Sequence, residues 1–276
     1  MMTTDLFAGR RVGVAGLGVI GKRVAQFVSA GAAGPLKLTA VASRDKATAR
    51  EFCSLLVPQP AVVTIEDLAT VADLVVDCTP ADVFRRVAEP VIEAGATLLP
   101  LSVAALLDNM GLVDRAAETG AQIIVPTGAI LGLDTVRAMG VGTLHRVALQ
   151  TRKPPRGLLG APHLIDNKIS LEGISEPLLV FSGNAREAAR GFPANVNVAA
   201  ALALAGVGPD RTEVEVWADP TIDRNVQSVT IESDAGEATM TIWNVPSEEN
   251  PKTGKVVAQS VVAALTRHVA PLVVGS

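Results

Sequence analysis

The first half of the chain alternates short apolar runs with longer segments of helical periodicity. RVGVAG at 11–16 predicts a strand, VIGKRVAQFVSAG at 19–31 a helix that ends at Gly31, and LKLTAVAS at 36–43 another strand. The alternation continues with two further helices and three further strands, at 45–56 and 83–95 and at 74–80, 96–102 and 122–129. Repeated strand–helix–strand units predict a doubly wound parallel sheet, an α/β fold with helices on both faces.

The pattern changes after residue 129. Five segments alternate apolar and polar residues as strands do when one face of a sheet is open, at 145–153, 177–183, 212–220, 225–233 and 238–245. The segment 253–269 has helical spacing, and we expect this C-terminal helix to return to the first domain. The sequence therefore predicts a first domain over 1–129, completed by 253–276, and an inserted α+β domain over 130–252.

Composition supports this division. A chain of 276 residues is long enough for two cores, and its interior must be aliphatic because aromatic residues make up only 3% and Tyr is absent. The formal net charge of -4, with basic residues spread along the chain, leaves no cationic face for a polyanion. Nucleic acid is not an expected partner.

Candidate metal, disulfide and membrane features are weak. Cys53 and Cys78 lack C-x-x-C spacing, and no two of the three histidines have metal-ligand spacing, so we expect no metal site. The N-terminus has no basic leader segment, and the longest strongly apolar run, 196–207, is shorter than the roughly 20 residues of a membrane span. A cytoplasmic protein without membrane contact is the expectation.

The turn after the first strand carries the clearest motif. Gly16, Gly18 and Gly21 have G-x-G-x-x-G spacing between a strand and a helix. In this context the first glycine makes the turn, the second admits a pyrophosphate, and the third allows close helix–strand packing. Backbone N–H groups at Val19 and Ile20 would face the phosphates at the helix N-terminus. The motif predicts a dinucleotide cofactor; a purely structural glycine turn is the alternative.

The end of the second strand bears on the choice of cofactor. An acidic residue that binds the adenosine ribose usually lies about 20 residues after the glycine loop, but Ser43 and Arg44 stand at this strand end. A hydroxyl and a guanidinium suit a 2′-phosphate. Asp45 follows, and we expect it to cap the next helix. The cofactor is predicted to be NADP or NAD.

Conventional catalytic groups are scarce, and G-x-S-x-G is absent. Hydride transfer needs few protein groups because the cofactor carries the difficult step. Arg152 and Lys153, at a strand end, could hold a substrate carboxylate or form a solvated strand end. Asn195 and Asn197 lie at the start of an apolar helix. A helix N-cap would explain one of these two amide side chains but not the second. The polar connection 218–228 is the third dense polar stretch.

These stretches together resemble one family. GLGVIG, LSVAAL, VPTGAILGLD, TRKPP, GNAREAARGFPANVNVAAALALAG, VEVWADP and NPKTGK, in this order and spacing, resemble the L-aspartate dehydrogenase family over nearly the whole chain. The resemblance implies a Rossmann-type domain with an inserted α+β substrate and dimerisation domain. It also implies an NAD(P)-dependent enzyme that interconverts L-aspartate and iminoaspartate, or oxaloacetate plus ammonia, usually as a homodimer. Ala104 in LSVAAL stands where the family commonly has Gly.

The resemblance also implies site residues. Nicotinamide-side contacts fall on Ala129 and Asn197, and the family's catalytic histidine position falls on Gln227, in ADPTIDRNVQ. The cofactor contacts that we predict are Gly16, Gly18, Val19, Ile20, Gly21, Ser43, Arg44, Cys78, Thr79, Ala129 and Asn197.

Gln227 leaves the chemistry open. An amide can donate and accept hydrogen bonds but cannot exchange a proton near neutral pH. Lys153 and His163 are candidate replacements, and we assign catalytic positions to Gln227 and Lys153. The substrate is expected to be a small dicarboxylate or imine. Two alternatives remain: a reductase for a different imine or carbonyl compound, and a non-catalytic NADP-binding protein.

Overall fold

The structure is a computed structural model that describes residues 10–193, 196–248 and 254–275. The chain divides into two compact units, Met1–Pro126 with Ala258–Val273, and Thr127–Val257 with Val274–Ser276. The predicted domain boundaries, after residue 129 and before residue 253, lie near these divisions and remain a prediction.

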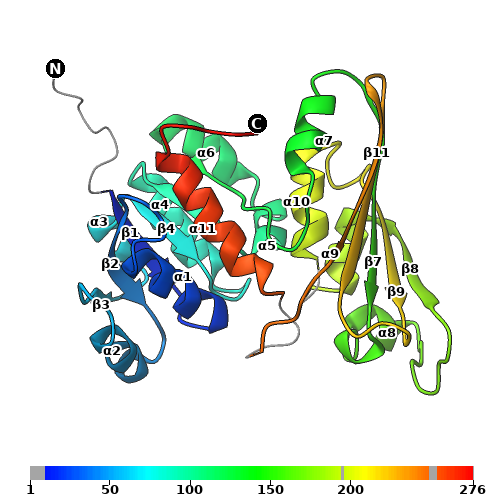
Figure 1. Cartoon of the computed structure of the whole chain (residues 1–276), viewed down its shortest axis with the longest axis horizontal. Helices are drawn as coiled ribbons and strands as arrows, with labels where there is room; N and C mark the ends of the chain where they lie inside the picture. Colours follow the sequence, from blue (N-terminus) through cyan, green and yellow to red (C-terminus); the bar gives the residue numbers. More distant parts are fainter. Residues whose placement is uncertain (1–9, 194–195, 249–253, 276) are drawn as a thin grey trace. The chain divides into compact units, whose positions relative to one another are not determined.

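The first unit contains a six-stranded parallel sheet in the order β3-β2-β1-β4-β5-β6 (Figure 1). The strands are β1 (Arg11–Ala15), β2 (Lys37–Ala42), β3 (Ala61–Val63), β4 (Leu74–Asp77), β5 (Thr97–Pro100) and β6 (Gln122–Ile123). The helices are α1 (Val19–Ser29), α2 (Lys46–Ser54), α3 (Leu68–Val71), α4 (Phe84–Glu93), α5 (Val103–Leu107), α6 (Gly111–Thr119) and α11 (Val256–Val269). This is the predicted Rossmann-type sheet.

The C-terminal helix α11 lies beside α1 in this unit (Figure 1). One core cluster contains Val14 of β1, Val24 and Val28 of α1, and Val261 and Leu265 of α11, all nearly inaccessible to solvent. Aliphatic side chains from three elements thus exclude water from one face of the sheet. The predicted return of the last helix to the first domain is confirmed.

Two strands differ from the sequence prediction. No strand was predicted at β3, because it has only three residues and follows a segment with prolines at 58 and 60. The predicted strand 122–129 ends at Ile123 instead. Pro126 cannot donate to a strand ladder, and Gly128 has φ +63°, so the chain leaves the sheet before Ala129.

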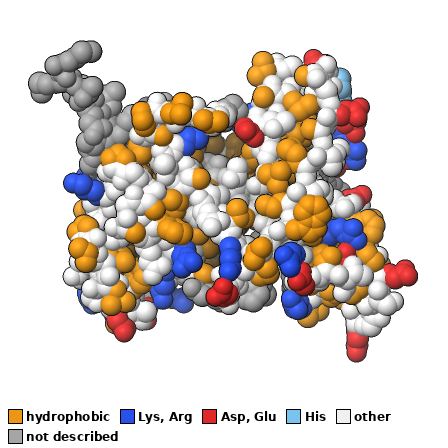
Figure 2. Space-filling model, in the orientation of Figure 1, with side chains coloured by type: hydrophobic (Ala, Val, Ile, Leu, Met, Phe, Trp, Pro, Cys, Tyr) orange, Lys and Arg blue, Asp and Glu red, His pale blue; other side chains and the backbone are white. Residues whose placement is uncertain are grey.

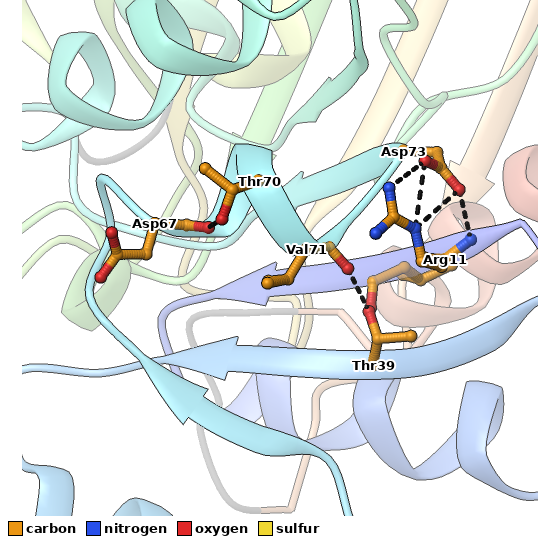
Figure 3. A network of polar contacts seen from close by, with 7 residues as sticks. Arg11, Thr39, Asp67, Thr70, Val71 and Asp73 are labelled. Carbon is orange, nitrogen blue, oxygen red and sulfur yellow. Dashed lines mark hydrogen bonds and ion pairs between the residues drawn. The ribbon is translucent and has the colours of Figure 1, made fainter.

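Polar contacts fix the edge of this sheet at which the parallel strands begin (Figure 3). Arg11, at the start of β1, donates from Nη2 to Asp73 Oδ1 at 2.6 Å, just before β4 begins. Thr39 donates from Oγ1 to the Val71 carbonyl at 2.8 Å. These contacts align the strands at the edge of the sheet where they begin. The glycine loop lies at the opposite edge, directly after the end of β1.

The second unit contains a five-stranded mixed sheet in the order β11-β10-β7-β9-β8. Its strands are β7 (Leu144–Lys153), β8 (Leu178–Asn184), β9 (Glu213–Ala218), β10 (Val226–Ser233) and β11 (Gly236–Trp243). Its helices are α7 (Leu133–Met139), the 3-10 turn η1 (Pro155–Gly157), α8 (Pro162–Asp166), α9 (Ala185–Gly191) and α10 (Asn197–Ala205). Among the described strand pairs of this sheet, β7–β9 alone is parallel.

The two faces of this second sheet differ, as the alternating sequence predicts. On β7, Val147, Leu149, Thr151 and Lys153 are buried, and the residues between them are more exposed. The end of α10 packs on this covered face, since a Cβ at Gly206 would lie 3.4 Å from Val147 Cγ2. The open face carries polar and charged residues such as Arg146, which pairs with Glu213 at 2.9 Å.

Charged side chains of both signs are scattered over the surface that Figure 2 shows. This distribution, with the net charge of -4, gives no cationic track on that surface. Within the described residues, every helix is too short or too polar to cross a bilayer.

Candidate active site

The glycine loop joins β1 to α1, and its backbone is packed too tightly for side chains at two positions. Gly16 has φ +86°, and a Cβ there would lie 2.8 Å from the Cys78 carbonyl oxygen. A Cβ on Gly21 would lie 1.9 Å from the Gly16 carbonyl oxygen. Only glycine fits either position, so the first and third glycines of the motif serve the turn and the helix–strand contact.

Gly18 differs from its neighbours because nothing lies within 4 Å of the Cβ it lacks. The protein's own atoms therefore do not require glycine at this position. Gly18 is the N-cap of α1 and no side chain caps the helix; the first intrahelical bond runs from Lys22 N to the Gly18 carbonyl. The Val19, Ile20 and Gly21 N–H groups and the helix dipole face this open space, which fits a pyrophosphate.

The other predicted cofactor residues of this unit follow strands beside β1. Ser43 and the exposed Arg44 follow β2, and Cys78 and Thr79 follow β4. Asp45 is confirmed as a helix cap, since it accepts from the N–H groups of Ala47 and Thr48 at 3.0 and 3.1 Å. The carboxyl ends of β2, β1 and β4 meet at the point where strand order reverses, the usual position of a dinucleotide.

Asp77, which the sequence analysis did not single out, lies buried at this edge with no exposed area. Its Oδ1 accepts from Thr79 N and Thr79 Oγ1 at 2.9 and 2.6 Å, which shapes the turn that presents Cys78 and Thr79. Its Oδ2 is buried and has no hydrogen-bond partner among the described residues. Burial raises the pKa of Asp77 to about 6, and the Thr79 hydrogen bonds oppose this only in part.

Replacing Asp77 with Asn is expected to change how stability depends on pH. Because folding raises the Asp77 pKa, ionising the carboxyl costs stability as pH rises from about 4 to 6, by about 3 kcal/mol in total. The free energy of unfolding of Asp77→Asn minus that of the wild type should therefore increase by up to about 3 kcal/mol between roughly pH 4 and pH 8. Urea titrations across this range measure it; a difference independent of pH would contradict it.

Four buried polar residues lie at one end of the covered face of the second sheet: Thr151, Lys153, Gln227 and Asn244. We call these four residues the polar quartet. Gln227 on β10 pairs directly with Thr151 on β7. Lys153 lies two residues beyond Thr151, and Asn244 lies two residues beyond Ile242, the partner of Gln227 on β11. Side chains two apart along a strand share a face, and Asn244, just past the end of β11, continues the ladder because its N–H donates to the Asn225 carbonyl at 2.9 Å. All four side chains therefore project to the same side.

Three oxygens of the polar quartet have no hydrogen-bond partner among the described residues: Thr151 Oγ1, Gln227 Oε1 and Asn244 Oδ1. A buried polar group without a partner costs about 1–3 kcal/mol, and folded proteins contain few of them. Three such oxygens on one face therefore indicate a place built for a ligand or water.

Lys153 gives the polar quartet a group that can exchange protons. The side chain is buried, and burial lowers the pKa of the ammonium to about 8. An amine with this pKa carries substantial populations of both protonation states near neutral pH. Lys153 is thus suited to general acid–base catalysis, which works best when the pKa lies near the working pH.

Arg152 and Lys153 are adjacent residues of β7 and therefore lie on opposite faces of the sheet. They do not act together as the cationic pair that the sequence suggested. Arg152 Nη2 lies 2.8 Å from Oδ2 of the fully buried Asp219. Thr221 donates to Asp219 Oδ1 from its backbone N and its Oγ1, at 2.9 and 2.6 Å. Burial raises the pKa of Asp219, but the Thr221 and Arg152 contacts outweigh it and hold the pKa below its ordinary value. Asp219 thereby fixes the connection that leads to Gln227.

His163 lies apart from Gln227 in this unit. It is on α8, with its ring 5.2 Å from the ring of Phe181 on β8 and 5.4 Å from that of Phe192. Two strands, β7 and β9, separate β10 from β8, and neighbouring strands are about 4.8 Å apart. His163 is part of an aromatic cluster rather than of the polar quartet.

Asn244 also contacts a predicted nicotinamide residue. Its Nδ2 donates to the Ala129 carbonyl at 3.0 Å, which fixes Oδ1 as the free acceptor of the amide. Asn197 is the exposed first residue of α10, whose N-cap is Val196 without a side-chain cap; Asn195 lies outside the described residues. Sequence reasoning missed Thr151 and Asn244. The available signal was that each is a polar residue at a position where the strand alternation predicts an apolar one.

A parallel sheet with an open glycine loop at its switch point, joined to a mixed α+β unit, defines a two-part NAD-binding protein of the Rossmann class. Residues 16–126 match the family described as homoserine dehydrogenase, NAD binding domain, and residues 134–268 match aspartate dehydrogenase, C-terminal. Among the described residues, no group of three or more His, Cys, Asp and Glu side chains is arranged to hold a metal ion.

The chain is similar over its length to curated proteins. It is 50% identical to the L-aspartate dehydrogenase of Bradyrhizobium diazoefficiens, covering 96% of this chain and 94% of that protein. It is 49% identical to L-aspartate dehydrogenase 3 of Bordetella bronchiseptica, covering 96% and 97%. The crystal structure of aspartate dehydrogenase from Thermotoga maritima shares the fold, with a TM-score of 0.73, 21% identity, and coverage of 96% and 99%. The chain belongs to the L-aspartate dehydrogenase family.

Proposed function

We propose that this protein catalyses the NAD(P)-dependent interconversion of L-aspartate and iminoaspartate, which exchanges with oxaloacetate plus ammonia. The identity of 50% over 96% of the chain carries this proposal. The polar quartet supports it, because a buried amine and three oxygen acceptors suit a substrate that carries an N–H group and gains or loses a proton. The bound nicotinamide nucleotide supplies or accepts the hydride.

The first unit would hold the cofactor. We assign the pyrophosphate to the N–H groups that follow Gly18, at Val19 and Ile20, with Gly16 and Gly21 keeping the loop close to β4. Cys78 and Thr79 would border the cofactor from the end of β4. Ala129 and Asn197 would contact the nicotinamide, and Asn244 would fix the Ala129 carbonyl.

We assign proton transfer to Lys153. In the direction of aspartate oxidation, its neutral Nζ accepts a proton from the substrate ammonium, so that the nitrogen lone pair can form the C=N bond as hydride leaves C2. In the reverse direction, the protonated amine returns the proton. Gln227 orients the substrate by hydrogen bonding and does not exchange a proton, since an amide does not titrate near neutral pH.

Arg44 favours NADP binding. The guanidinium is exposed at the end of β2, and Asp45 beside it is engaged in capping α2, so no carboxylate at this strand end is available to the ribose. We propose that NADP binds at least as tightly as NAD.

Replacing Arg44 with Gln is expected to raise the Kd of NADP by roughly 10- to 150-fold, the loss of one charge-assisted hydrogen bond, while the Kd of NAD changes about twofold or less. Calorimetric titration with both cofactors measures this. Arg50→Gln, at an exposed arginine of α2, is the matched control and should leave both Kd values unchanged. Equal weakening of NAD and NADP by Arg44→Gln would contradict a 2′-phosphate contact.

The family resemblance implies a homodimer, and we propose this assembly for the protein. Size-exclusion chromatography with light scattering should give a mass twice the chain mass of 28.5 kDa. A mass of one chain at micromolar concentration would contradict a stable dimer.

The activity is tested by following the oxidation of reduced nicotinamide with oxaloacetate and ammonia. We expect turnover that requires ammonia. Gln227 favours one other function on the same fold, the reduction of a different small imine or carbonyl compound, because a glutamine stands where the family has its histidine. Activity restricted to substrates that are not dicarboxylates would select that function, and cofactor binding without any turnover would contradict both.

A further inference from the structure

The adjacent strands β7, β10 and β11 bring three oxygen acceptors to one place on the covered face: Thr151 on β7, Gln227 on β10, and Asn244 directly after β11. Gln227 stands directly opposite Thr151, where Cβ atoms are about 4.5–5.5 Å apart. Asn244 occupies the diagonal position across β10 and β11, within reach of a long amide side chain. Exposed fractions of 5%, 3% and 3% for Thr151, Gln227 and Asn244 exclude bulk water as their partner.

The chemistry of these atoms selects what binds there. Thr151 Oγ1, Gln227 Oε1 and Asn244 Oδ1 are all oxygens, and none has a hydrogen-bond partner among the described residues. A carboxylate could accept a hydrogen bond from the Thr151 hydroxyl, but it would place its negative oxygens against the two amide oxygens, which can only accept. An ammonium or iminium group brings two or three N–H donors and a positive charge, which these acceptors complement.

We propose that Thr151, Gln227 and Asn244 form the subsite for the nitrogen of the substrate, and that their oxygens accept hydrogen bonds from its ammonium or iminium N–H groups. This inference rests on the proposed function and deepens it. It gives Gln227 a role that an amide can perform, which is recognition of the nitrogen beside the proton-exchanging amine of Lys153. It also adds Thr151 and Asn244 as specificity-determining residues.

The test compares two ligands that differ at the nitrogen. L-Aspartate and succinate have the same two carboxylates, but succinate has a methylene where aspartate carries the ammonium. Their Kd values are measured by calorimetry on full-length protein saturated with reduced cofactor, which cannot accept a hydride from aspartate. The wild type is expected to bind aspartate about tenfold or more tightly than succinate.

Two near-isosteric variants remove acceptors, and two matched variants keep them. Thr151→Val and Gln227→Met should each raise the Kd of aspartate about tenfold and change that of succinate less than about threefold. Thr151→Ser and Gln227→Glu retain an oxygen at each position and should keep the preference for aspartate. Because each ligand serves as the other's control within one variant, general loosening of the fold shifts both values together.

These measurements distinguish a failure of the nitrogen subsite from a failure of the proposed activity. Equal Kd values for aspartate and succinate in the wild type, or equal shifts of both in Thr151→Val and Gln227→Met, would overturn the nitrogen subsite even if turnover with oxaloacetate and ammonia is intact. Preference for aspartate that these two variants remove, in a protein without turnover, would support the subsite and contradict the proposed activity instead.

Discussion

Replacing Lys153 with Met is expected to lower kcat/KM for aspartate oxidation by about 10²–10⁴, the usual contribution of a positioned acid or base. The affinity for nicotinamide nucleotides should be unchanged, since we assign the cofactor phosphates to the glycine loop. The variant is not expected to lose stability, because burying a charged amine is costly and Met fills similar space. Steady-state kinetics and cofactor titration on the same preparation measure both quantities.

The pH dependence of the wild type provides a second readout of Lys153. Aspartate oxidation needs the neutral amine, and burial lowers the pKa of Lys153 to about 8. The rate should therefore rise with pH through a midpoint near 8, and this rise should disappear in Lys153→Met. His163→Gln is the matched comparison for the other candidate base, and its loss in kcat/KM should be less than about tenfold because His163 packs against Phe181 and Phe192. The reverse ranking of the two variants would contradict our assignment.

Replacing Gly18 with Val is expected to weaken binding of both NAD and NADP by roughly 10- to 150-fold or more. The added side chain would enter the open space above the N-terminus of α1 and separate the phosphates from the backbone N–H groups. Loss of even one hydrogen bond to a charged group costs about 1.5–3 kcal/mol, and each 1.4 kcal/mol is tenfold in Kd.

Gly111→Val is the control for that substitution. Gly111 is also a first-unit glycine at a helix start with nothing within 4 Å of its missing Cβ, so it tests the cost of added bulk alone. Both variants should unfold near the wild-type temperature, and only Gly18→Val should lose cofactor affinity. Retained affinity in Gly18→Val would mean that the open space above α1 does not hold the phosphates.

The sequence predicts all strands except β3, and the helices α1, α2, α4, α10 and α11, because the periodicities of these elements are strong. β1 and α1 follow from an apolar run and a helical repeat around the glycine loop, and β7 and β10 follow from strict alternation. The short strand β3 and the early end of β6 were beyond prediction, because such short pairings depend on neighbouring strands more than on their own residues.

The candidate site was only partly predictable. Gly16 and Gly21 are explained by contacts with Cys78 and with the loop itself, as the motif predicts. Gln227 lies near Thr151 and Asn244 because of the strand register, which brings together residues far apart in the sequence. The sequence alone does not reveal this register. The separation of Arg152 from Lys153 also became clear only with the sheet, since adjacent residues of a strand point to opposite faces.

The most direct test of the central claim uses reduced nicotinamide nucleotide labelled with deuterium at C4, supplied with oxaloacetate and ammonia. If the protein reduces iminoaspartate, proton and deuterium NMR will show L-aspartate carrying deuterium at C2, and none will form without ammonia. Labelled malate as the product, with or without ammonia, would contradict the claim, because it would show hydride transfer to the ketone rather than to the imine.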